Sequence, residues 1–444
     1  MRLSFISMAY LISSLSATAQ VTPAAAEPPQ ARPCPADVAK GSQCLTGRDS
    51  AGAYYWLVMP PIWNGTLVVH AHGGPELGTP KRERPAEDAT RWAIWSRAGY
   101  AYAGSGFRQG GVAVHSAAED TDRVRALFVA QWGQPKVTVL HGQSWGAGVA
   151  ARTAEIFATA NNGKSNYDAV LLTSGVLGGG SQSYNFRLDL RVVYQAICNN
   201  HPRPEETAYP LWQGLPVKST LTRAELVTRV DACTGIRQKP ADRTATQQRN
   251  LKTIVDVIRI PETSVLGHMN WATWHFQDIV FNRLGGRNPF GNEKVRYRGS
   301  LDDDALNAQV ARYTADPAAL KDFSAVADPQ GRIPVPVLTM HGIHDAVAFV
   351  ELESTFRDTM ANGGSLSRLV QVFTRDESHS YSSDAQYVTA MRALLDWAAS
   401  GTKPTPASVA SQCAGVAANF EPQTGCRFFP EFQPQPLASR VPTP

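Results

Sequence analysis

The chain has 444 residues, of which 43% are hydrophobic and 18% are charged. That length and balance suffice for one large core or two moderate ones, and they exclude an intrinsically disordered chain. The formal net charge of +4 is spread over mixed-sign sequence without a basic block. Neither a nucleic-acid partner nor binding to an acidic membrane surface is therefore predicted.

The amino terminus has the pattern of an export signal. Arg2 precedes an apolar stretch that runs from about Leu3 to Leu15, and Ala17-Thr18-Ala19 supplies a small-x-small cleavage site. We predict that residues 1–19 are a signal peptide and that residues 20–35, rich in Pro and Ala, form a flexible leader. No later stretch approaches about 20 uninterrupted apolar residues, so we expect a secreted or periplasmic protein without a membrane span.

Six cysteines fit an oxidising compartment. Six cysteines allow about 15 connectivities in principle. None has C-x-x-C spacing or lies beside histidines at ligand spacing, so no metal site is predicted. We expect disulfides between neighbours in the sequence, which pair Cys34 with Cys44, Cys198 with Cys233 and Cys413 with Cys426.

Apolar runs typical of buried strands alternate with helical patterns along two parts of the chain. This alternation predicts an α/β fold with a doubly wound, mainly parallel sheet. We expect strands at 54–59, 66–71, 100–103, from 137 onward, 169–173, 335–340 and 369–373, and helices at 89–97, 118–132, 147–158 and 384–399.

A long interval interrupts this alternation between the strands at 169–173 and 335–340. It is too long for an ordinary connection and contains several helical patterns, so we predict an inserted, mostly helical cap. The expected division of the chain is a first core segment at 36–175, the cap at 176–333, a second core segment at 334–400 and a Pro-rich, disulfide-stapled tail at 401–444.

The sequence Gly142-Gln143-Ser144-Trp145-Gly146 follows one of these apolar runs and precedes a helical pattern of small residues. A G-x-S-x-G match alone is weak, because Gly and Ser are common residues. Between a strand and a helix, however, the two glycines permit a sharp turn that presents the serine hydroxyl to a substrate. We therefore predict that Ser144 is a nucleophile.

A serine nucleophile needs a base, and the base needs an acid that fixes its tautomer. Asp345 follows the strand at 335–340 and His379 follows the strand at 369–373. The order Ser144, Asp345, His379 resembles that of the α/β-hydrolase superfamily, over about residues 54–175 and 334–400. By this resemblance Ser144 is the nucleophile, His379 the general base and acid, and Asp345 its orienting carboxylate, with no cofactor.

The same resemblance implies an oxyanion hole. The N–H of Trp145, which follows the nucleophile, is the first donor. The segment His72-Gly73-Gly74-Pro75 is similar to the His-Gly-Gly loop of the superfamily, so we expect the N–H of Gly74 as the second donor, with Gly73 as the alternative.

Several other side chains have competing interpretations. Trp271 and Trp274, three residues apart on a possible helix, could pack in the core or line a substrate pocket. We favour structural roles for four histidines that could support loops, which are His70, His72, His341 and His344. Asp304 is more typical of a helix-capping residue than of a calcium ligand. Asp376 and Glu377 could replace Asp345 as the orienting acid, but they lie too close in sequence to His379 for us to prefer them.

These patterns favour an exported serine hydrolase that cleaves carboxylic esters, small or polymeric, through an acyl-enzyme. The aromatic residues of the cap suggest an apolar or aromatic ester. One alternative is a secreted serine exopeptidase, in which Glu205, Glu206 or Glu262 would bind the substrate's amino terminus. Another is a non-catalytic binding protein that retains the fold. The oligomeric state stays open.

Overall fold

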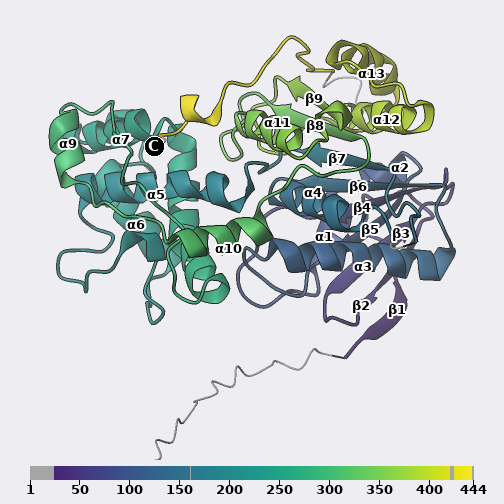
Figure 1. Cartoon of the computed structure of the whole chain (residues 1–444), viewed down its shortest axis with the longest axis horizontal. Helices are drawn as coiled ribbons and strands as arrows, with labels where there is room; N and C mark the ends of the chain where they lie inside the picture. The colour runs from purple at the N-terminus through teal and green to yellow at the C-terminus, as the bar shows by residue number, and fades with distance from the viewer. Residues whose placement is uncertain (1–24, 161, 421–424, 443–444) are drawn as a thin grey trace, which may run out of the picture.

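A computed structural model describes residues 25–160, 162–420 and 425–442 (Figure 1). Its strands form one nine-stranded sheet in the order β1-β2-β3-β5-β4-β6-β7-β8-β9. The pairs from β5 to β9 are parallel, and β1, β2 and β3 pair antiparallel at one edge, which confirms the mainly parallel sheet. The strands are β1 Glu27–Arg32, β2 Gln43–Arg48, β3 Tyr54–Met59, β4 Thr66–Ala71, β5 Ala101–Ser105, β6 Val137–Gln143, β7 Ala169–Thr173, β8 Val337–Gly342 and β9 Leu369–Thr374.

Helices cover both faces of the sheet, so the fold is doubly wound as predicted. Val69 of β4 and its partner Leu140 of β6 face a core that includes α3 and α4. Val68 and its partner Val139 point to the opposite face, where α1, α2, α12 and α13 pack. These helices, with α11, are α1 Arg84–Arg91, α2 Ile94–Arg97, α3 Val114–Trp132, α4 Trp145–Phe157, α11 Leu352–Asn362, α12 Asp384–Ser400 and α13 Pro406–Phe420.

Between β7 and β8 the chain leaves the sheet, and no strand is described within residues 176–333, which we call the insertion. In Figure 1 helices α5, α6, α7 and α9 group to the left of the sheet and α10 leads back toward it. The exact domain boundaries stay a prediction. The helices are α5 Gly179–Cys198, α6 Arg223–Thr234, α7 Ala245–Ile258, α8 Val265–Asn270, α9 Asp303–Gln309 and α10 Pro317–Ala327, with 3-10 turns at Leu211–Gln213, Pro240–Asp242 and Glu262–Ser264 and π-helical turns at Trp271–His275 and Asp278–Arg283.

The two ends of the chain differ from the expectation. Residues 27–32, expected within a flexible leader, form strand β1 and pair with β2, which was not predicted either. Most β1 side chains are exposed, so the strand lacks the apolar pattern by which strands are recognised. In the tail, helix α13 was not predicted; it packs on α12, and the N–H of Phe429 donates to the carbonyl of Phe373 at 2.8 Å.

The three expected disulfides are all present. The Cα atoms lie 5.3 Å apart in Cys34–Cys44, 5.6 Å in Cys198–Cys233 and 5.9 Å in Cys413–Cys426, within the range that a disulfide bridges. The predicted signal peptide, residues 1–19, lies outside the described residues.

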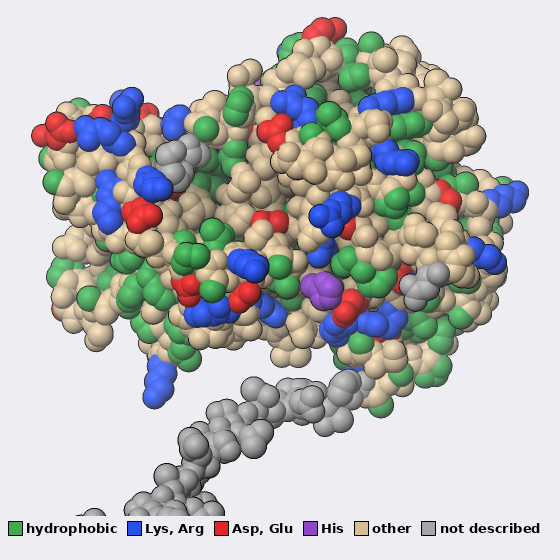
Figure 2. All heavy atoms as spheres, in the orientation of Figure 1, with side chains coloured by type: hydrophobic (Ala, Val, Ile, Leu, Met, Phe, Trp, Pro, Cys, Tyr) green, Lys and Arg blue, Asp and Glu red, His purple; other side chains and the backbone are tan. Residues whose placement is uncertain are grey.

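Charged side chains of both signs are interspersed over the face shown in Figure 2. In the described part of the chain no helix is long and apolar enough to cross a membrane. The same residues contain no group of three or more His, Cys, Asp or Glu side chains that could hold a metal ion.

Candidate active site

Ser144 occupies the sharp turn between β6 and α4. Its backbone φ is 57° and ψ is −125°, a conformation that is costly for a residue with a side chain. Two hydrogen bonds of 3.0 Å hold it there: its N–H donates to the carbonyl of Thr173, and its own carbonyl accepts from the N–H of Val176. The turn is therefore tied both to β7 and to the start of the insertion.

The glycines on either side of this serine are required by close backbone contacts. A Cβ atom on Gly142 would lie 2.4 Å from the carbonyl oxygen of Gly146, and one on Gly146 would lie 2.1 Å from the carbonyl oxygen of Ala71. Real Cβ atoms do not approach a carbonyl oxygen so closely, so β6, the turn and α4 can pack this way only with glycine at both positions.

A strained serine between two such glycines, at the carboxyl end of a central parallel strand that feeds a helix, has the strand-turn-helix geometry of the α/β-hydrolase fold. The strand order, with its antiparallel strands at one edge, agrees with that assignment. The chain has the α/β-hydrolase fold.

In this fold the other two predicted residues reach Ser144. His379, in the loop after β9, has its Nε2 atom 2.8 Å from Ser144 Oγ. Its Nδ1 atom lies 2.7 Å from Oδ2 of Asp345, in the loop after β8. The second carboxylate oxygen of Asp345 accepts hydrogen bonds from the N–H groups of Val347 and Ala348, at 2.8 and 3.0 Å. The three residues thus form one hydrogen-bonded chain whose acidic end is held by backbone groups.

The protonation states of this chain follow from its contacts. Burial would raise the pKa of Asp345, but hydrogen bonds from His341 and His379 outweigh burial and hold that pKa below its usual value. Asp345 is therefore an anion at neutral pH and accepts the Nδ1–H of His379. With that hydrogen on Nδ1, the Nε2 atom of His379 faces the Ser144 hydroxyl as a hydrogen-bond acceptor.

His341 lies beneath Asp345 and is fully buried. Its Nδ1 atom is 3.0 Å from Oε1 of Glu353, and its Nε2 atom is 2.8 Å from the carbonyl oxygen of Ala348 and 3.5 Å from Oδ2 of Asp345. Glu353 also accepts two hydrogen bonds through Oε2, so it is a carboxylate. Because both ring nitrogens of His341 face acceptors, both carry hydrogen. Burial lowers the pKa of His341, but the hydrogen bonds to Asp345 and Glu353 outweigh burial and raise the pKa to about 10.

The expected oxyanion-hole residues flank Ser144, and their role stays a prediction. Trp145 is the first residue of α4, where helix N–H groups lack intrahelical acceptors. Gly74, in the loop after β4, has φ of 71°, and within the described residues its N–H makes no hydrogen bond. A Cβ on the alternative donor, Gly73, would lie 2.3 Å from the side chain of Gln143, so this glycine is needed for packing.

The loop that carries His379 is held by residues that the sequence did not single out. Gln143 donates to the hydroxyl of Ser380, and the carbonyl of Ser380 accepts from the side chains of Arg91 at 3.0 Å and Tyr387 at 3.1 Å. Since Gln143 immediately precedes Ser144, the nucleophile turn and the histidine loop are directly joined. Gln143 lies inside the G-x-S-x-G motif, and that position was the only sequence signal for this contact.

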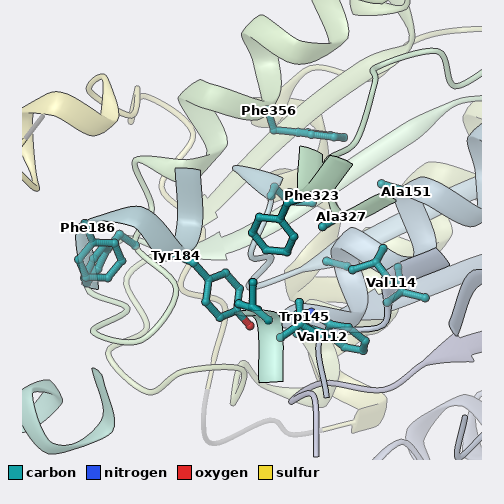
Figure 3. Close-up of a cluster of buried hydrophobic side chains, with 14 of the residues drawn as sticks. Val112, Val114, Trp145, Ala151, Tyr184, Phe186, Phe323, Ala327 and Phe356 are labelled. Carbon is teal, nitrogen blue, oxygen red and sulfur yellow. The ribbon is translucent and has the colours of Figure 1, made fainter. Parts of the chain in front are cut away.

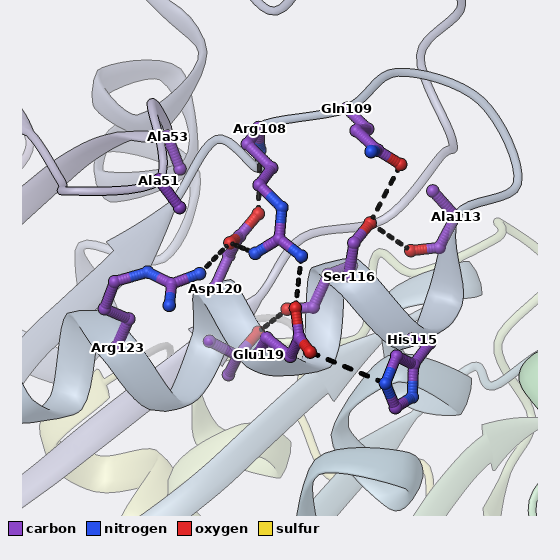
Figure 4. Close-up of polar contacts among 12 residues, drawn as sticks. Ala51, Ala53, Arg108, Gln109, Ala113, His115, Ser116, Glu119, Asp120 and Arg123 are labelled. Atoms are coloured by element: carbon purple, nitrogen blue, oxygen red, sulfur yellow. Dashed lines mark hydrogen bonds and ion pairs between the residues drawn. The ribbon is translucent and has the colours of Figure 1, made fainter. Parts of the chain in front are cut away.

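A charged network fixes the loop that follows β5 (Figure 4). Asp120, buried in α3, accepts from the backbone N–H of Arg108 at 2.8 Å and from the guanidinium groups of Arg108 and Arg123 at 2.6 Å. At the far end of this loop the N–H of Val112 donates to Asp278 of the insertion at 2.8 Å. The ion pairs thus anchor this loop to α3, and the separate contact with Asp278 joins it to the insertion.

The two predicted pocket tryptophans lie in different surroundings. The ring of Trp271 stacks on His275 with centroids 4.3 Å apart, and His275 donates through Nε2 to the carbonyl of Pro75 at 3.1 Å, beside Gly74. Trp274 instead packs against the guanidinium of Arg223 in α6, 5.4 Å from its ring. Trp271 therefore approaches the predicted oxyanion loop, and a substrate-binding role for either ring stays a prediction.

The other side chains with competing interpretations lie outside the contacts of Ser144, His379 and Asp345. Asp376 is bound by Arg427 and by Gln386 at 3.1 Å. Asp304 pairs with Arg296 at 2.5 Å, and Asp302 caps helix α9 in its place. The remaining residues are His70, which contacts His141 at 2.9 Å; His72, whose Nδ1 lies 3.0 Å from the carbonyl of Gly73; and Glu377 and His344, which are exposed.

Two of the three carboxylates that the exopeptidase alternative would need form ion pairs with arginines. Glu206 accepts from Arg229 at 2.7 Å and Glu262 from Arg243 at 3.1 Å, both within the insertion. Glu205 is exposed.

No protein-family model and no curated protein matches the chain. Solved structures similar to it include feruloyl esterase B from Aspergillus oryzae, at 13% identity and a TM-score of 0.43, covering 88% of this chain and 90% of that one. The rice cell wall degrading esterase LipA from Xanthomonas oryzae is similar at 14% identity and a TM-score of 0.36, covering 85% and 89% of the two chains. Likeness this remote carries no information on activity.

Proposed function

We propose that the protein is a serine hydrolase that cleaves carboxylic esters through an acyl-enzyme intermediate. The observation that carries this proposal is the contact of His379 with Ser144 Oγ at 2.8 Å on one side and with Asp345 at 2.7 Å on the other. A serine hydroxyl in contact with an unprotonated imidazole, whose tautomer a buried carboxylate holds, is an activated nucleophile.

In the first half-reaction Ser144 Oγ attacks the ester carbonyl carbon and transfers its proton to Nε2 of His379. Asp345 stabilises the resulting imidazolium, and the N–H groups of Trp145 and Gly74 donate to the tetrahedral oxyanion. Collapse of this intermediate breaks the bond to the alcohol, which leaves with the proton from His379. Water then attacks the acyl-enzyme by the same route, the acid is released and Ser144 recovers its proton.

We infer an exported enzyme from two independent features. Three disulfides are typical of proteins that fold in an oxidising compartment. The first residues of the sequence have the pattern of a cleavable signal peptide.

We prefer an ester to a peptide as the substrate because two of the three carboxylates considered for binding an amino terminus already form ion pairs. Glu206 and Glu262 neutralise arginines of the insertion, so recruiting either one would leave a cation without its partner. We therefore do not propose exopeptidase activity.

The test is to react the purified protein with a fluorophosphonate and to measure turnover of p-nitrophenyl esters and aminoacyl anilides. We expect labelling at Ser144 and ester turnover that Ser144→Ala lowers by at least about 10⁴-fold. Ser174→Ala is the matched control, because Ser174 is also buried and also has a positive φ, at 45°. A wild-type protein that is not labelled, or a Ser144→Ala variant with wild-type turnover, would refute the proposal. Turnover of the anilides without turnover of the esters would indicate a peptidase.

A further inference from the structure

Arg187 of α5 is a buried cation without an anionic partner. The residue is 4% exposed, and within the described residues no carboxylate lies at ion-pair distance from its guanidinium. Its Nη1 donates to the carbonyl of Ser183, whereas its Nε–H has no hydrogen-bond partner in that part of the chain. Burying a guanidinium without a counter-ion is costly, and a protein tolerates it where the charge has a use.

Aromatic rings surround this guanidinium. Its central carbon lies 4.7 Å from the ring centroid of Phe186, 5.0 Å from that of Tyr184 and 5.1 Å from that of Trp271. Contacts with ring faces stabilise the cation but leave the N–H donors in the guanidinium plane unused. The environment is therefore suited to a planar acceptor that lies between aromatic rings.

Two side chains around Arg187, together with Asp278 elsewhere in the insertion, lead to contacts with three core loops. Phe186 packs on Phe349, after β8, with ring centroids 5.3 Å apart. Trp271 stacks on His275, which donates to the carbonyl of Pro75, after β4. The third contact is that of Asp278 with the N–H of Val112, after β5. In the sheet order β5-β4-β6-β7-β8, these loops lie on both sides of β6, which ends at Ser144.

Two more polar atoms of this region are unpaired. The hydroxyl of Tyr184 and Nδ1 of His275 are buried and have no hydrogen-bond partner among the described residues. Figure 3 shows Tyr184 projecting toward Trp145, the residue after the nucleophile. The unused Nε–H of Arg187 and hydroxyl of Tyr184 are donors, and Nδ1 of His275 is an acceptor because Nε2 carries the hydrogen, so a polar ligand group would find both kinds of partner here.

We propose that Arg187 binds a carboxylate group of the substrate, so that the enzyme selects esters that carry a free carboxylate in addition to the scissile bond. The assignment rests on the proposed function, since it names the substrate class of the same site. Arginine suits this role because its planar fork matches a carboxylate through two parallel hydrogen bonds. A site built around a buried donor also disfavours an analogue that leaves the donor unpaired.

Arg191 provides a matched control on the same helix. It is fully buried and likewise has no carboxylate at ion-pair distance within the described residues. Its Nε and Nη1 also have no hydrogen-bond partner among the described residues, but its Nη2 contacts the hydroxyl of Tyr209 and the carbonyl of Gly214, both at 3.4 Å, inside the insertion. Substituting Arg191 should therefore affect the stability of the protein without changing its preference for esters that carry a carboxylate.

The experiment compares kcat/KM within two substrate pairs: p-nitrophenyl hydrogen succinate against p-nitrophenyl butyrate, and 4-carboxyphenyl acetate against phenyl acetate. We expect the kcat/KM of wild-type protein to be about tenfold or more higher for the carboxylate-bearing ester in at least one pair. Arg187→Met should abolish this preference, and Arg191→Met should retain it. Arg187→Lys keeps the charge without the fork and should retain only part of the preference.

No preference in wild-type protein for either pair would overturn the assignment even if Arg187→Met fails to fold. A preference that persists in folded Arg187→Met would do the same. Fluorophosphonate labelling at Ser144 separates the two proposals: labelling without charge preference leaves the ester hydrolase intact, whereas absence of labelling removes both.

Discussion

His341 donates a hydrogen bond from Nδ1 to the carboxylate of Glu353 over 3.0 Å, in a region that solvent does not reach. The protonated imidazole of His341 lies 3.5 Å from Asp345, which contacts His379. Because the charge favours the anionic form of Asp345, the orienting carboxylate stays ionised even though it is buried.

The first prediction concerns the alkaline limit of stability. A histidine whose pKa is raised to about 10 on folding stabilises the protein fully below its unfolded pKa, near 6.5, and that contribution is lost as the pH rises through 10. The free energy of unfolding should thus fall by at most about 1.4 kcal/mol per pH unit between these values. Glu353→Gln should lower stability by about 3 kcal/mol at pH 7 and flatten this slope.

Urea unfolding at pH 6, 8 and 10 measures both effects. Glu351→Gln is the control, since Glu351 is two residues away and forms a more exposed ion pair with Arg440 at 3.3 Å. An unchanged pH slope in Glu353→Gln would show that His341 is not the group that titrates.

The second prediction separates the two glycines of α4. In Gly146→Ala the new methyl group would lie 2.1 Å from the carbonyl oxygen of Ala71, so the turn must shift and Ser144 with it. We expect a loss of ester turnover of at least about 100-fold, because small displacements of a nucleophile cost that much. In Gly148→Ala the nearest atom is 3.4 Å away, so turnover should remain within a few-fold of wild type. Equal effects of the two substitutions on kcat would count against this steric account.

The third prediction concerns the disulfide Cys198–Cys233, which joins the end of α5 to α6 within the insertion. It closes a loop with a sequence separation of 35, for which chain entropy gives a contribution of about 3 to 4 kcal/mol. The double substitution of both cysteines by serine should lower the melting temperature of the insertion. Differential scanning calorimetry under non-reducing conditions would show the change, and a transition identical to that of wild type would contradict it.

The fourth prediction concerns Asp189, a fully buried acid of α5. Burial raises its pKa to about 8, although the hydroxyl of Tyr297 donates to Oδ1 at 2.7 Å. The folded protein therefore binds a proton that the unfolded chain releases above pH 4, so stability falls as the pH rises from about 4 to 8. Asp189→Asn should be more stable than wild type at pH 8, by on the order of 1 kcal/mol, and nearly equal at pH 4.

Thermal unfolding at the two pH values tests this expectation, with Asp256→Asn as an exposed control that pairs with Lys252. A variant that is less stable at pH 8 would mean that the ionised form of Asp189 is needed.

Local patterns in the sequence predicted the central strands, the flanking helices and the turn at Ser144, because their periodicity and glycine spacing are properties of short segments. Strand β1 was missed because it gains its stability from pairing with β2 and not from buried side chains of its own. The roles of Ser144, Asp345 and His379 came from their order in the chain and remain proposals.

The contacts that no pattern predicted join segments far apart or depend on packing. Glu353 meets His341 only because α11 folds back under β8, and Gln143 meets Ser380 across 237 positions. Arg187 lies in an ordinary helical pattern, and only the packed structure shows that no carboxylate within the described residues neutralises it.

Ser144 and His379, the proposed nucleophile and its proposed base, are encoded on opposite sides of the insertion. During synthesis Ser144 emerges from the ribosome 235 positions before His379, and the whole insertion is translated between them. A chain that has been made only as far as the insertion therefore has the serine without the base that activates it. The proposed activity can arise only once the second core segment has joined the sheet, so ester turnover would report on completed folding in the compartment where the disulfides form.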